Sequence, residues 1–308
     1  MIRISRLSPL ALLLALVAGC ASHSSPRARV QDEFGVLVMA HGGRPEWNQG
    51  VLSAVAPLRD RYDIEVAFGM ADAASIDEAV RRLEARGVRK IGVVRLFVSG
   101  ESWYERTEQI LGVAAGAPAR PTPAGHAHAA HGHDHAMAFW KVETEASFAL
   151  SKQGLAEAPE MGVILADRAS ALSRRPELED VLILAHGPGD DGENERWLGH
   201  LDARADAVRQ RLPFRRVRVE TLREDWPEKR AEAARRIRAF VQGAADEGGR
   251  AVVVPFRVYG FGPYRELLGG LDYVSDGVGL IPHRNVTSWL EQQVRTLQPG
   301  PFRNAASR

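Results

Sequence analysis

Short apolar runs alternate with amphipathic stretches along the chain from residue 35 onward. The run GVLVMAH (35–41) is apolar almost throughout, and in the next stretch (46–62) hydrophobic residues recur at helical spacing. The same alternation then predicts strands over 63–69 and 90–100 and helices over 75–87 and 101–112. Strands and helices in this rhythm predict a doubly wound α/β unit with a parallel sheet.

The helix expected over 75–87 carries its own boundary signals. Ser75 is followed three residues later by Glu78, which predicts a capping box at the start of the helix. Gly87 comes after the last turn and is expected to end the helix, because glycine readily adopts the left-handed conformation common at that position.

The pattern of the first part of the chain occurs a second time. VLILAHGPG (181–189) matches VLVMAHGGR (36–44), so that His186 falls where His41 falls. Further elements are then expected: helices over 193–212, 227–244 and 286–297, and strands over 214–222, 250–260 and 277–283. We therefore expect an α/β fold made of two duplicated doubly wound parallel-sheet units.

A histidine-rich segment separates the two units. Residues 113–138 have neither strand nor helix period and predict a surface loop. Its H-x-H and H-x-x-H spacings offer imidazole nitrogens to Zn, Cu, Ni or Co without fixing a geometry, through His126, His128, His131, His133 and His135. After the loop, 139–151 is expected to contain the last strand of the first unit, and 160–173 the helix that ends it. The units are accordingly assigned to 34–175 and 176–300.

The first residues of the chain are typical of an export signal. A positive start and a short apolar core predict a signal peptide over 1–19, and LVAGC resembles a bacterial lipobox that ends in Cys20. An ordinary signal peptide is the alternative. Residues 20–33 then form a polar tether, and no retention signal follows the cysteine. The expectation is a lipoprotein anchored in a membrane and facing the periplasm, with the outer membrane favoured.

Composition narrows the range of functions. Of the 308 residues, 45% are hydrophobic and 26% charged, with a formal net charge of +1, as in a soluble globular protein that does not bind nucleic acid. Cys20 is the only cysteine, so the mature chain has neither a disulfide nor a thiolate metal ligand. Glycines at 260–270 lack the spacing of a nucleotide-binding loop, and no G-x-S-x-G elbow is present.

Two histidines are the first candidates for chemistry. His41 and His186 each end an apolar strand and precede a glycine, and ligands of open α/β sheets bind outside the carboxyl ends of the strands. The alternative is a histidine that is hydrogen-bonded to a neighbouring carbonyl group. His283 is a third candidate, since it ends the expected last strand and is placed to face His186; it serves equally as a cap for the final helix.

Three stretches carry a resemblance to a known family. VLVMAHGGRPEWNQGV (36–51), IDEAVRRLEARGVRKIGVVRLFVSG (76–100) and the second AHG (185–187) resemble the sirohydrochlorin and cobalt chelatases, class II enzymes that insert a divalent metal into a tetrapyrrole without ATP. The resemblance covers most of 35–112 and, more loosely, 160–297.

The resemblance implies roles for individual residues. His41 would hold the incoming metal or accept a pyrrole proton. The family's second histidine follows the third strand in a Gly-x-His setting, where this chain has Gly100-Glu101-Ser102 and Gly260-Phe261-Gly262. Glu101 can substitute as metal ligand and base; its alternative is a surface carboxylate at a helix start. Walls for the macrocycle are expected from Gly42, Gly43, Phe97, Trp103 and Tyr104.

Two functions remain open on the sequence. The first is an enzyme that inserts Co, Ni or Fe into a tetrapyrrole such as sirohydrochlorin, with the metal received by His41, His186 or His283. The second is a non-catalytic exported lipoprotein that binds or buffers metal, Zn included, and retains the chelatase fold. In either case the histidine tract (126–135) is expected to collect metal ions and not to be the active site, because no rigid element fixes its geometry.

Overall fold

The computed structural model describes residues 33–121 and 137–304. The expected signal peptide, Cys20, the tether apart from its last residue and the five histidines of the tract lie outside the described residues. The described residues fall in one compact unit, Asp32–Arg308. Among them, no helix is both long and apolar enough to cross a membrane.

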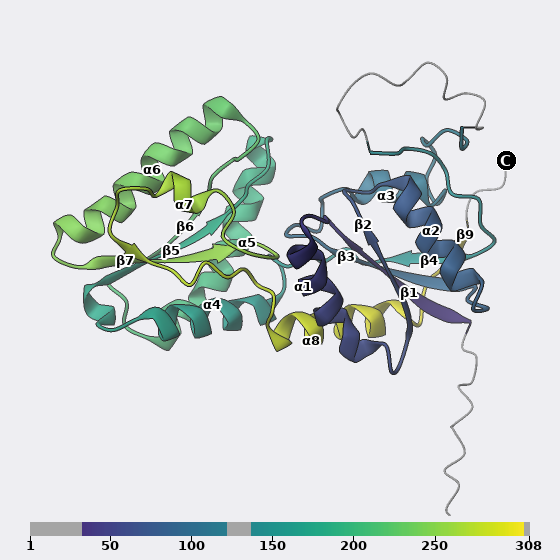
Figure 1. Cartoon of the computed structure of the whole chain (residues 1–308), viewed down its shortest axis with the longest axis horizontal. Coiled ribbons are helices and arrows are strands. Elements are labelled where there is room, and N and C mark those ends of the chain that lie inside the picture. Colours follow the sequence, from purple (N-terminus) through teal and green to yellow (C-terminus); the bar gives the residue numbers. More distant parts are fainter. Residues whose placement is uncertain (1–32, 122–136, 305–308) are drawn as a thin grey trace, which may run out of the picture. The chain divides into compact units, whose positions relative to one another are not determined.

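The first sheet is built from the strands that the alternation predicts. Its order is β2-β1-β3-β4-β9, and the first four strands are parallel (Figure 1). The strands are β1 (Phe34–Ala40), β2 (Asp63–Phe68), β3 (Lys90–Leu96), β4 (Ser147–Leu150) and the antiparallel β9 (Arg303–Asn304). All seven residues of β1 are buried, as expected for a central strand with helices on both faces.

Helices cover both faces of this sheet. Alternate residues of β1 point to opposite faces, so Val36 and Val38 pack with α1 while Leu37 and Met39 pack with α2. The helices are α1 (Pro45–Val55), the short η1 (Ala56–Leu58), α2 (Ala73–Glu84) and α3 (Tyr104–Ile110). The doubly wound prediction is therefore confirmed for the first unit.

The start of α2 differs from the prediction. Asp72 is the N-cap, and its side chain accepts a hydrogen bond from the Ser75 amide at 2.9 Å. The capping-box prediction at Ser75 is wrong, because Asp72 has the extended backbone of a cap and also accepts a bond from the Ala138 amide at 2.7 Å. Gly87 lies past the end of the helix at φ +87°.

The second sheet repeats the strand order of the first. Its order is β6-β5-β7-β8, all parallel, which matches β2-β1-β3-β4 position by position. The strands are β5 (Glu179–Ala185), preceded by η3 (Pro176–Leu178), then β6 (Arg216–Thr221), β7 (Arg250–Phe256) and β8 (Tyr273–Val274). They alternate with α5 (Asp191–Arg211), α6 (Pro227–Asp246) and α7 (Tyr264–Leu267).

Each half covers one face of its sheet with a helix from the other half. The helix α4 (Pro159–Leu172) follows β4 but packs on α5 and β7, whereas α8 (Arg284–Leu297) follows the second sheet but packs on β3 and α1. Trp289 of α8 is fully buried. Residue 175 therefore divides the repeat in the sequence, whereas the packing crosses it in both directions. The assignment of two chelatase-like domains to 34–175 and 176–300 stays a prediction.

The expected strand over 277–283 is not formed. The edge strand β8 is shorter and earlier, and the chain then turns at Gly277, which has a φ of +67°. Only Leu280 and Ile281 continue beside the residues that follow β7, donating to the carbonyls of Arg257 (2.7 Å) and Val258 (2.9 Å). Pro282 has no amide proton with which to extend a ladder.

Candidate functional site

His41 and His186 have the same local geometry. Each is the first residue after the opening strand of its sheet, and each ring Nδ1 lies against the carbonyl oxygen of the following glycine, at 2.8 Å from Gly42 and 2.7 Å from Gly187. A carbonyl oxygen only accepts, so Nδ1 carries the proton in both rings. Nε2 is then the nitrogen left for a second proton or a metal ion.

The glycine after each histidine is required by the backbone and by its neighbours. Gly42 has a φ of +78° and Gly187 a φ of +80°, in the left-handed region. A Cβ atom on Gly42 would lie 3.1 Å from Phe68 Cβ, and one on Gly187 would lie 2.6 Å from Thr221 Cβ. The next strand thus approaches each turn so closely that only glycine fits without a shift.

The two histidines differ in what faces Nε2. In the second half, Nε2 of His186 lies 3.0 Å from Asp225 Oδ2 and 3.9 Å from Glu224 Oε2. No described residue is a partner of His41 Nε2. Asp225 thus presents a carboxylate oxygen to the ring nitrogen of His186 that is not bonded to Gly187. Sequence reasoning missed this pair, although both carboxylates directly follow the predicted strand over 214–222.

Both histidines line one cleft, which has a volume of about 760 Å³. The cleft is bordered by strand-end segments of both sheets, and its wall includes the predicted residues Glu101, Phe97 and Trp103. Four of the six tryptophans of the chain also line it: Trp47, Trp103, Trp197 and Trp226. The carboxylates of Asp190, Glu193 and Asp225 supply negative charge. Flat apolar walls beside anionic groups suit a planar molecule and a cation in the same space.

Glu101 is held by an arginine from the second half. Arg196 of α5 donates from Nε to Oε1 at 2.8 Å and from Nη2 to Oε2 at 2.6 Å. This two-point bond lowers the pKa of Glu101, so the carboxylate is a weaker base than a free one. Glu101 lies three residues before the start of α3, and its role as a metal ligand stays a prediction.

A buried arginine fixes the loop that carries Glu101. Arg95 of β3 is almost fully buried and donates to the backbone carbonyls of Gly100 and, at 2.6 Å, Ser102. Burial lowers the pKa of Arg95 to about 10, which leaves it cationic at neutral pH. The following residue of the loop, Trp103, has a φ of +59°, a conformation that costs about 1–3 kcal/mol in a residue other than glycine. The indole is thus held at the cleft against a local backbone preference.

Three further predicted residues lie in the turns or core, outside the cleft wall. Tyr104 stacks under the guanidinium of Arg95, 4.5 Å from ring centroid to Cζ, and burial raises its pKa. Gly42 and Gly43 shape the turn after β1, where the Gly43 amide donates to Asn48 at 2.9 Å. Contact of these residues with a substrate stays a prediction.

His283 is a helix cap. Its Nδ1 accepts a hydrogen bond from the Asn285 amide at 3.1 Å, and it is the N-cap of α8. The prediction that His283 ends a strand and faces His186 across a crevice is wrong, because the chain turns at Gly277 before that strand can form. Of the two alternatives, the cap is the one found. Burial lowers the pKa of His283, which favours the neutral ring that a cap requires.

The C-terminal end of the histidine-rich loop, at Met137, is hydrogen-bonded to α3 near the cleft. Arg106 of α3 donates to the carbonyls of Ala71 at 2.9 Å and Met137 at 3.0 Å. Ala71 follows Met70, which lines the cleft. The described part of the chain holds no ready-made group of three or more histidine, cysteine or acidic side chains around a metal position.

Comparison with known proteins identifies the first half. Residues 35–168 match the family model of CbiX. This segment is similar to that family. Among curated proteins, none matches the chain. Solved structures with a similar fold, in contrast, match most of the chain and not this segment alone.

Two solved structures share the fold over nearly their full length. The chain is similar to SirB from Bacillus subtilis with Fe³⁺, with 14% identity, a TM-score of 0.57 and coverage of 85% of this chain and 94% of the other. The cobalt complex of the sirohydrochlorin chelatase SirB from Bacillus subtilis subspecies spizizenii gives 11% identity, a TM-score of 0.57 and coverage of 87% and 96%.

A third match is longer than this chain. A multi-domain protein of Deinococcus radiodurans with structural similarity to chelatases is 19% identical, with a TM-score of 0.50; the match covers 86% of this chain and 54% of that one. Together with the CbiX segment, these matches make the chain a chelatase-like α/β protein in fold. The predicted fold class is confirmed, and the match over 35–168 agrees with the predicted resemblance to the chelatases.

Proposed function

We propose that the protein is a chelatase-like enzyme that inserts a divalent metal ion into a tetrapyrrole such as sirohydrochlorin. The observation that carries the proposal is the single cleft in which a strand-end histidine from each half meets a wall of tryptophans. The CbiX segment and the fold shared with SirB, whose structures hold Fe³⁺ and cobalt, support the same reaction.

The metal ion is a substrate here, and the donors suit transient binding. His41 lines the cleft, no described residue is a partner of its Nε2, and the carboxylates of Glu101 and Asp190 line the same cleft. One imidazole with one or two carboxylates leaves coordination positions to water, so the ion can be passed on. Such a donor set accepts Co, Ni, Fe or Zn and does not choose strongly among them.

The second histidine is suited to the proton transfer that insertion requires. Two pyrrole N–H groups must lose their protons as the metal ion binds four ring nitrogens. Nε2 of His186, which lies 3.0 Å from Asp225, can take up one of these protons, and the other passes to water. The macrocycle would lie against the indoles of Trp103 and Trp226, which are both about one third exposed.

The position of the protein in the cell remains part of this proposal. We place the chain as a lipoprotein anchored through Cys20 and facing the periplasm, with the outer membrane favoured. In that setting the tract at 126–135 collects metal ions for His41. Arg106 bonds both Met137, at the end of the histidine-rich loop, and Ala71, which follows Met70 of the cleft wall. We infer that the metal ions collected by the tract are delivered to the cleft from this side.

An insertion assay tests the proposal. Purified protein is mixed with sirohydrochlorin and Co²⁺, Ni²⁺, Fe²⁺ or Zn²⁺, and the change in the tetrapyrrole absorbance spectrum is followed. His41→Ala and Asp225→Asn should slow insertion, whereas His200→Ala, an exposed histidine on α5, should leave the rate unchanged. Absence of insertion with all four metals would refute the enzyme. Retained metal binding would then favour the alternative, a non-catalytic metal-buffering lipoprotein.

A further inference from the structure

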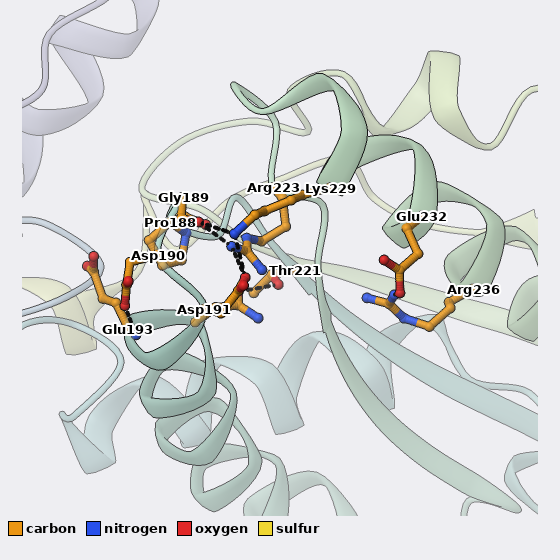
Figure 2. Close-up of polar contacts among 11 residues, drawn as sticks. Pro188, Gly189, Asp190, Asp191, Glu193, Thr221, Arg223, Lys229, Glu232 and Arg236 are labelled. Carbon is orange, nitrogen blue, oxygen red and sulfur yellow. Dashed lines mark hydrogen bonds and ion pairs between the residues drawn. The ribbon is translucent and has the colours of Figure 1, made fainter.

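Arg223 ties together the loop that follows His186. Its main-chain amide donates to the His186 carbonyl at 2.7 Å. Its guanidinium donates to the carbonyl oxygens of Pro188 and, at 2.6 Å, Gly189, and to Asp191 Oδ1 at 2.8 Å (Figure 2). One residue thus contacts the backbone at three points between the histidine and the start of α5.

The neighbours of Arg223 hold the same loop from two further sides. Lys229 of α6 donates to the Gly189 carbonyl at 2.7 Å and to Asp191 at 2.6 Å (Figure 2). The Trp226 ring lies against Gly189, where an added Cβ would come within 2.2 Å of the indole. Arg223 and Trp226 flank Asp225 in the sequence, so the turn that clamps the loop also carries the carboxylate facing His186.

The first half has no such clamp. The Gly69 amide donates to the Ala40 carbonyl, as the Leu222 amide does to the Ala185 carbonyl, each at 2.9 Å. By this correspondence Met70 stands where Arg223 stands, and a thioether donates no hydrogen bond. Among the described residues, the turn after His41 has the contact of the His41 ring with the Gly42 carbonyl and the bond from the Gly43 amide to Asn48, and no arginine or lysine bond to its carbonyls.

Two features of Arg223, its burial and its backbone conformation, would each lower the stability of the fold. Its side chain is buried, and its one carboxylate partner, Asp191, is largely exposed. Its φ of +58° lies in the region that side chains other than glycine avoid. Strain of this kind persists where the surrounding structure enforces it and is concentrated at functional sites.

We propose that Arg223 is a positioning residue that fixes Nε2 of His186 against Asp225. This inference rests on the proposed function, because it assigns the two histidines different tasks. The clamped His186 accepts protons in a fixed geometry, while the unclamped His41 adapts to a metal ion that exchanges ligands. A proton acceptor benefits from fixed geometry because small displacements slow the transfer strongly.

The test compares Arg223→Met and Arg223→Lys with Arg236→Met in the full chain. Arg236 lies on α6 and pairs with Glu232 at 2.7 Å (Figure 2) and with Glu220 at 3.6 Å. Its loss therefore removes an arginine and two ion pairs but none of the bonds to the loop after His186. Nitrogen NMR of ¹⁵N-histidine-labelled protein, free of metal and tetrapyrrole, reports the imidazole state, and His186→Ala assigns the signal.

Arg223→Met should shift or broaden the His186 signals, and Arg236→Met should not. In the assay with Co²⁺ and sirohydrochlorin, kcat of Arg223→Met should fall about 10- to 100-fold, the range for loss of a supporting partner. KM should change little, and Arg223→Lys should recover part of kcat.

Unchanged His186 signals in folded Arg223→Met would overturn the inference, as would a kcat equal to that of Arg236→Met. If the wild type inserts no metal, the proposed function fails by itself, and the NMR comparison still decides the role of Arg223. If Arg223→Met does not fold, as judged by near-ultraviolet circular dichroism, Arg223→Lys against Arg236→Lys gives the same comparison.

Discussion

Alanine at the glycine after each histidine tests the turn geometry quantitatively. The left-handed backbone alone costs about 1–2 kcal/mol for alanine. Gly87 measures this term by itself, because it has a φ of +87° and no atom within 4 Å of an added Cβ. Gly42→Ala adds a contact at 3.1 Å, and Gly187→Ala adds one at 2.6 Å.

The contact at Gly187 cannot be relieved by a rotation. The atom it meets is Cβ of Thr221, the buried last residue of β6, and the hydroxyl of Thr221 donates a hydrogen bond to Asn194 at 2.6 Å. Overpacking of this kind costs about 1–3 kcal/mol, so Gly187→Ala should lose about 2–5 kcal/mol in all. Gly42→Ala should fall between Gly187→Ala and Gly87→Ala.

Urea unfolding of the three variants measures these differences. The free energy of unfolding should fall in the order Gly87→Ala, Gly42→Ala, Gly187→Ala, with an unchanged dependence on urea. Gly199→Ala, in the interior of α5 with open space around it, should be neutral or stabilising and serves as a control. A Gly187→Ala protein as stable as Gly87→Ala would refute the close approach of Thr221 to the turn.

Three further predictions concern charge and metal supply. His283→Asn should keep the cap of α8 but remove a pH dependence of stability. Because the pKa of His283 is lowered from 6.5, the wild type is fully stable above that pH and loses stability as the pH falls through the lowered value. Thermal unfolding measured against pH tests this difference between the wild type and the variant. Arg196→Met should raise the pKa of Glu101 and tighten Co²⁺ binding measured by calorimetry; an unchanged affinity would exclude Glu101 as a ligand. Deletion of 126–135 should slow insertion at low metal concentration and leave the rate at saturating metal intact.

Local signals in the sequence predicted the elements well. The strand over 35–41 and the helix over 160–173 were found to within a residue or two because each has a continuous pattern of its own. The cap of α2 was misplaced by three residues, since Asp72 competes with Ser75 for the same role and also bonds Ala138 across a long separation. Which of two nearby polar residues caps a helix thus depends on a contact that the local pattern does not contain.

The candidate site was predicted only in part, for the same reason. His41 and His186 could be found because each follows a strand and repeats the other. Asp225 and Arg223 could not, because they meet the His186 loop only through the parallel pairing of β5 with β6, more than thirty residues apart in the chain. The sequence did not decide whether Glu101 is a metal ligand or a surface carboxylate, because its two-point bond with Arg196 depends on a helix from the other half.

The exchange of α4 and α8 makes the two halves one cooperative system. A fragment that ends at residue 175 would keep β1 and β3 but lose α8, whose Trp289 and Leu290 belong to the apolar core shared with that sheet. The fragment that begins at 176 would lack α4 over β7 in the same way. Neither half should therefore fold when expressed alone, and the intact chain should unfold in a single transition, because loss of one sheet uncovers the other.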